Sequence, residues 1–76
     1  MPISQDEQMA LDEMKAQRFE IYRSCMTFCR EALRADETLL RAMGHKTPSD
    51  AIVYAVKDAL SRSEALDKAF LRRFPD

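Results

Sequence analysis

The sequence predicts an all-α protein, because three of its features favour helices. Apolar residues recur at helical spacing over two long stretches, about residues 5–34 and about residues 48–74. The 76 residues include one glycine and three prolines, which argues against a turn-rich β-fold. Capping residues stand before each expected helix. We therefore expect a single small domain over residues 1–76, built as an antiparallel helical hairpin or as a small three-helix bundle with a short middle helix.

The first helix is expected over about residues 5–34. Ser4 and Glu7 form a capping box, and acids in the first turn suit the helix dipole. At 100° per residue, one face collects Leu11, Met14, Ile21, Tyr22, Cys25, Cys29, Ala32 and Leu33, with Phe19, Met26 and Phe28 beside it. This face is patchy before Phe19, because Lys15 and Arg18 also project there.

A short second helix is expected over about residues 37–43. Asp36 is a suitable N-cap, and Gly44 suits the position just after the helix. The alternative is a first helix that runs on through Ala35 to Met43. We favour a break.

The last helix is expected over about residues 48–74. Thr47 can accept from the amide of Asp50, and Pro48 suits the first helical position. One face then collects Ile52, Val53, Ala55, Val56, Ala59, Leu60, Leu66, Phe70, Leu71 and Phe74. Ser61 and Glu64 could start a separate helix, but the apolar stripe keeps its phase there, so one continuous helix is favoured.

Two charged residues stand on these apolar faces. If the long helices pack antiparallel, Arg18 falls near the level of Asp67, and an ion pair between them would fix the register of the helices. Such a pair could form within one chain or between two chains. Alternatively, both side chains extend to the edge of the interface and never meet.

The expected core and contact surface divide the remaining large side chains. The expected core comprises Tyr22, Cys25, Cys29, Val56, Ala59, Leu60 and Phe70. The expected partner interface comprises Phe19, Met26, Phe28, Tyr54, Leu71 and Phe74. Tyr54 is assigned to it as an aromatic residue on the polar face of the last helix, where it is a contact anchor, a single exposed tyrosine, or a tyrosine covered by the short second helix.

No catalytic, cofactor or metal signature is present. Cys25 and Cys29 lie four residues apart on an apolar helix face, which predicts reduced thiols and a cytoplasmic or other reducing compartment. With His45 they lack a fourth ligand and a standard zinc spacing. The sequence therefore predicts a protein that is not an enzyme, with no cofactor and no metal.

The charge pattern limits the expected partners. The net charge is −1, so no bulk attraction to nucleic acid or anionic lipid is expected. No apolar run approaches the roughly 20 residues of a membrane span. The middle of the chain is mildly basic, through Arg30, Arg34, Arg41 and Lys46, which usually marks a solvated face.

Two functions compete on this evidence. The leading one is a small helical protein–protein interaction module, a regulator, inhibitor or accessory subunit that dimerises or docks on another protein, because a chain this short covers only part of its apolar stripes. The alternative is a helix-turn-helix DNA-binding regulator formed around Gly44. Its would-be recognition helix begins Ser49-Asp50-Ala51-Ile52, where an acid repels phosphate and no Arg, Asn or Gln reads bases.

Overall fold

The computed structural model of the protein describes residues 3–75, so Met1, Pro2 and Asp76 of the expected domain lie outside the described residues. Residues 3–75 form three helices and no strand, which confirms the all-α prediction. The helices are α1 (Gln5–Arg34), α2 (Glu37–Ala42) and α3 (Pro48–Arg73). None of these helices is long and apolar enough to cross a bilayer.

The helix ends follow from local capping. The side chains of Ser4, Asp36 and Thr47 each accept a hydrogen bond from the amide three residues further on, at 3.1, 2.8 and 3.0 Å. These bonds satisfy amides that have no partner within the helix. Pro48 occupies the first position of α3. Gly44 follows α2 with a φ of 89°, a left-handed conformation in which glycine avoids the strain of a β-carbon.

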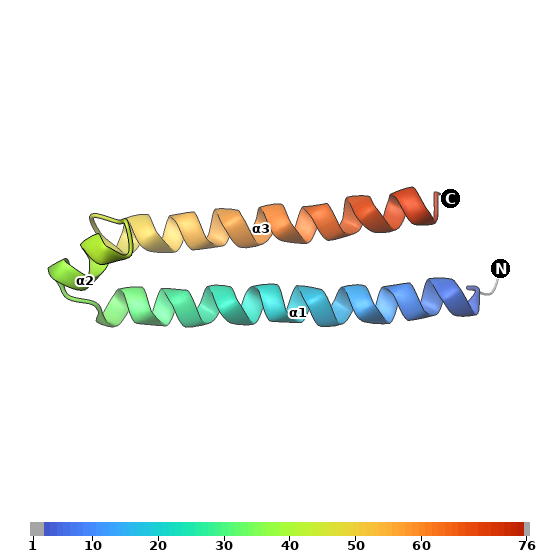
Figure 1. Ribbon diagram of the computed structural model, residues 1–76, viewed down its shortest axis with the longest axis horizontal. Helices are drawn as coiled ribbons and strands as arrows, with labels where there is room; N and C mark the ends of the chain where they lie inside the picture. The colour runs from blue at the N-terminus through green and yellow to red at the C-terminus, as the bar shows by residue number, and fades with distance from the viewer. Residues whose placement is uncertain (1–2, 76) are drawn as a thin grey trace.

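The two long helices lie side by side and run in opposite directions (Figure 1). α2 turns the chain at one end, and the start of α1 and the end of α3 lie at the other. The described molecule measures 54 × 16 × 16 Å, with a radius of gyration of 16.6 Å. A compact domain of this length would have a radius of gyration of about 11 Å. Residues 3–75 therefore form a two-helix rod, and none of them forms a further layer over either broad side of it.

Small side chains fill the line of contact between α1 and α3. The buried residues of α3 are Ala51, Ala55, Ala59 and Ser63, spaced four apart, and the buried residue of α1 is Ala32. We call these five residues the small-residue seam. Because small side chains let two helix backbones approach closely, they leave little room for large ones between the helices.

A second cluster closes the turn end. Leu40 of α2 is buried with Ala32 and Ala51, and Phe28 and Met43 pack against them. Among the described residues, no large side chain is completely buried. Most of the large apolar side chains are therefore at least partly exposed to solvent.

The expected core was partly wrong for this reason. Ala59 is buried, but Tyr22 and Val56 are each 42% exposed and Leu60 is 58% exposed. Cys25, Cys29 and Phe70 are half-buried. Val56 and Leu60 each directly follow a residue of the small-residue seam. Because α1 and α3 approach closely, only the small residue fits between the helices, and its larger neighbour projects to the surface.

Candidate protein-contact surfaces

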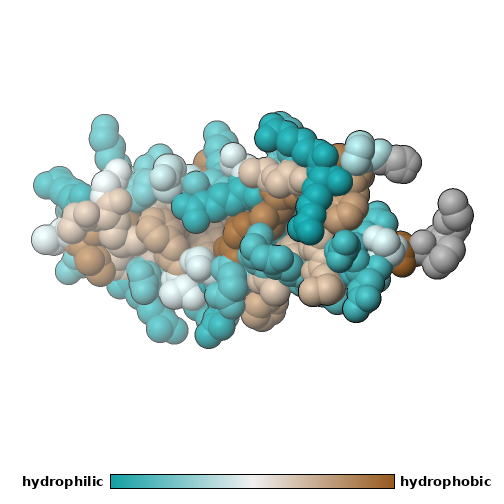
Figure 2. All heavy atoms as spheres, turned by 45° about the vertical axis from the view of Figure 1, so that its right-hand side comes forward, coloured by the Kyte–Doolittle hydropathy of each residue, from teal (hydrophilic) through white to brown (hydrophobic). Residues whose placement is uncertain are grey.

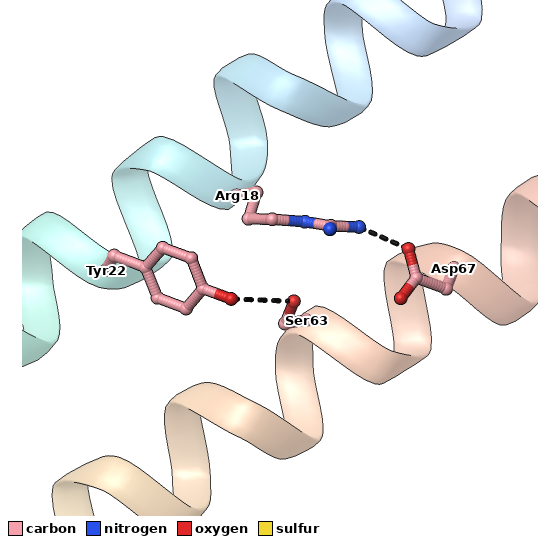
Figure 3. A network of polar contacts seen from close by, with 4 residues as sticks. All are labelled: Arg18, Tyr22, Ser63 and Asp67. Atoms are coloured by element: carbon pink, nitrogen blue, oxygen red, sulfur yellow. Dashed lines mark hydrogen bonds and ion pairs between the residues drawn. The ribbon is translucent and has the colours of Figure 1, made fainter.

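Two polar contacts cross between α1 and α3 one helical turn apart (Figure 3). The guanidinium of Arg18 donates to the carboxylate of Asp67, so the structure brings the two expected register residues together within one chain. The hydroxyls of Tyr22 and Ser63 lie 3.2 Å apart. The Arg18 and Asp67 side chains are 32% and 51% exposed, so water screens the ion pair and limits its contribution to below about 1 kcal/mol. The contact joins facing turns of α1 and α3.

Eight large apolar side chains form an exposed surface on one broad side of the rod. They are Phe19, Tyr22, Met26 and Leu33 of α1 with Val53, Val56, Leu60 and Leu71 of α3, each 42–66% exposed. At 100° per residue, each set of four falls within a 60° arc on the same side of the small-residue seam. We call this surface the apolar face. Figure 2 shows hydrophobic side chains reaching the surface of the molecule between hydrophilic ones.

The chain exposes more surface than its mass requires. Its accessible surface is 6133 Å². A compact protein of 8.8 kDa exposes about 4,800 Å². The difference of about 1,300 Å² arises because two helices alone cannot enclose the large side chains of both.

The opposite broad side carries a shallow groove of 330 Å³. Its lining residues are Glu20, Ile21, Ser24, Cys25 and Phe28 of α1 with Tyr54, Ala55, Asp58, Ala59 and Arg62 of α3. None of them belongs to the apolar face, so the two sides of the rod differ in character. Arg62 and Asp58 form an ion pair at 3.0 Å, which leaves their opposite charges neutralised within the groove.

An aromatic cluster fixes the turn against the groove. The ring of His45 lies between those of Phe28 and Tyr54, with centroids 5.9 and 5.2 Å away. His45 Nδ1 is also 3.1 Å from a carboxylate oxygen of Asp50. These contacts join the turn to both long helices. They give His45 a structural position.

The Cys25 thiol is poorly activated. Burial raises the pKa of the Cys25 thiol, and the neighbouring Cys29 raises it further. A raised pKa lowers the fraction of thiolate, which is the nucleophilic form. Among the described residues, no three His, Cys, Asp or Glu side chains gather closely enough to hold a metal ion.

The expected partner interface is divided between the two sides. Phe19, Met26 and Leu71 lie on the apolar face. Phe28 and Tyr54 line the groove instead. Phe74 lies at the open end of the rod, where its ring centroid is 5.1 Å from that of Phe70.

Five members of the apolar face are exposed but do not belong to the expected partner interface: Tyr22, Leu33, Val53, Val56 and Leu60. The sequence did contain a signal for them. Small residues at positions 51, 55, 59 and 63 repeat every four residues along one line of the last helix. Such a line is typical of close helix packing, and it implies that larger neighbours face away from it.

The basic middle of the chain is exposed. Arg30, Arg34, Arg41 and Lys46 all lie at the surface, around the turn end of the rod. Arg41 forms an ion pair with Glu37 at 2.6 Å, which offsets one of these charges.

No protein-family model, curated protein or solved structure matches this chain in the comparisons. The function is therefore argued from the geometry of the two sides.

Proposed function

We propose that the protein is a protein–protein interaction module that acts by binding through its apolar face, as a regulator, inhibitor or accessory subunit. The observation that carries the proposal is the exposure of eight large apolar side chains on one side of a two-helix rod. Contiguous exposed apolar patches of more than a few hundred Å² are rare on soluble monomers and mark interaction sites.

The composition of the apolar face favours a protein partner. It contains two aromatic residues and one methionine, side chains that are enriched at protein interfaces. It contains no carboxylate, histidine or cysteine that would transfer a proton or act as a nucleophile. The apolar face therefore suits binding rather than catalysis.

Photo-cross-linking from adjacent residues tests this function. Met26 lies on the apolar face, and its neighbour Thr27 is exposed on a different side of α1. p-Benzoylphenylalanine would replace each residue in turn, and the chain would be irradiated in cells of its source. We expect position 26 to give a defined protein adduct and position 27 to give none.

A second substitution shows whether such an adduct depends on the whole face. Leu60→Glu places a charge on the α3 side of the apolar face and should abolish the adduct from position 26. Ser61→Glu places the same charge on the adjacent exposed residue and should leave the adduct intact. The absence of any polypeptide adduct from position 26 would refute the proposed function.

A further inference from the structure

We propose that the occupant of the apolar face is a second copy of this chain, stacked face to face by a twofold axis to give a four-helix bundle. This inference rests on the proposed function, because it names the partner of the same surface.

The spacing of the exposed residues fits a bundle. Phe19, Tyr22 and Met26 are separated by three and then four residues, and so are Val53, Val56 and Leu60. Alternation of three and four is the pattern by which helices pack along the core of a coiled coil or four-helix bundle. α3 therefore carries two packing lines, and α1 carries a matching line of large residues. The small-residue seam serves the hairpin, and the line of large residues remains for a second layer.

The buried area fits a dimer of two identical hairpins. A compact particle of twice 8.8 kDa exposes about 7,900 Å². That is about 4,300 Å² less than two separate hairpins with 6133 Å² each. Permanent homodimers bury roughly 2,000–5,000 Å² in total. A second rod of the same length could thus cover the face at an area that a stable dimer requires.

The electrostatics of the face permit self-association. In a twofold interface the same residues meet on both sides, so a charge at its centre would meet an identical charge. Between Phe19 and Leu33 on α1, and between Val53 and Leu60 on α3, the positions in the arc of the apolar face are all uncharged. Outside these ranges Lys15 and Asp67 fall within the arc, and the Asp67 carboxylate is paired with Arg18 of its own chain. Two copies can therefore stack over the turn end and middle of the face without burying like charges.

Sedimentation equilibrium of the full chain and two neighbouring variants tests the inference. We expect the wild-type chain to behave as a dimer at micromolar concentration. Met26→Glu would bury a carboxylate from each copy and should raise the dissociation constant at least about 100-fold. Thr27→Glu, the matched control on a different side of α1, should leave the dissociation constant within about threefold, because a charge at an exposed surface position costs little.

The outcomes separate this inference from the proposed function. A wild-type chain that stays monomeric to about 100 µM would overturn the second copy as occupant, whereas the cross-links from position 26 would still report contact with a different protein. A dimer that Met26→Glu and Thr27→Glu affect equally would overturn the assignment of the face. If Met26→Glu loses its helicity, the wild-type melting temperature decides, because it rises with concentration for a dimer and stays constant for a monomer.

Discussion

Enlarging one residue of the small-residue seam should destabilise the protein far more than the same change nearby. Ala51 is 0% exposed and is buried with Ala32 of α1. Ala51→Leu adds three carbon atoms where the helices are in contact, so the helices must separate or the new side chain must adopt a strained rotamer. Overpacking of this kind costs about 1–3 kcal/mol. With a urea m-value of about 1 kcal/mol/M for so small a chain, the midpoint of unfolding should fall by about 1–3 M.

The control is Ala65→Leu, the same substitution at an exposed position of the same helix. It should change the free energy of unfolding by no more than a few tenths, about the difference in helix propensity between the two residues. Both variants would be unfolded in urea at one protein concentration and followed by circular dichroism. If Ala51→Leu is as stable as Ala65→Leu, α1 and α3 do not pack through the small-residue seam, and the reasoning fails.

The helix cap, the ion pair, the thiols and the basic turn each give a further expectation. Thr47→Ala removes the N-cap of α3 and should lower the free energy of unfolding by about 1 kcal/mol, and an unchanged urea midpoint would contradict the cap. Asp67→Asn leaves Arg18 without its charged partner at a partly exposed position, so the loss in the same assay should stay below about 1 kcal/mol. Burial raises the pKa of Cys25, so the unfolded chain releases this proton first and stability should fall as the pH rises above about 8.5. Cys25→Ser should reduce that fall. If the free energy of unfolding of Cys25→Ser depends on pH in the same way as that of the wild-type chain, the raised pKa of Cys25 is contradicted. A random DNA duplex at low salt should not bind with a dissociation constant below about 100 µM, because the net charge is −1; tighter, salt-sensitive binding would revive the helix-turn-helix alternative.

The helical elements were predictable because their signals are local. Ser4, Asp36 and Thr47 each stand directly before a helix and cap it as expected. Gly44 supplies the left-handed residue after α2. Apolar periodicity and caps act within a few residues, so they can be read without knowing what packs against the helix.

The division between core and surface was less predictable, because it depends on how closely the helices approach. A helical wheel places Leu60 and Ala59 on one broad apolar face, yet Ala59 is buried and Leu60 is 58% exposed. Only the distance between two helices decides which of two neighbouring residues occupies the interface. The regular spacing of Ala51, Ala55 and Ala59 indicates a close approach of the helices. From that spacing, Val56 and Leu60 could have been predicted to lie at the surface.

The surroundings of Phe28 and Tyr54 could not be predicted for a similar reason. Tyr54 is 59% exposed, as a wheel indicates, but His45 lies between its ring and that of Phe28. The turn reaches them because Gly44 reverses the chain, and nothing in the sequence gives the path of a turn through space. The Arg18–Asp67 contact could be suggested from the rise per residue along two antiparallel helices, since that distance is fixed by helix geometry.

The solvent accessibility of individual methyl groups tests most directly whether a second copy covers the apolar face. In the purified, methyl-labelled chain at about 100 µM, a concentration at which a micromolar dimer is largely formed, line broadening by a soluble paramagnetic agent would be compared across residues. Leu40, 5% exposed, is the buried reference and Met9, 62% exposed, is the exposed reference. We expect the methyl groups of Leu60 and Val56 to be protected as strongly as those of Leu40. Broadening of both as severe as that of Met9 would show that the face remains open to water in the purified protein, and would contradict the dimer.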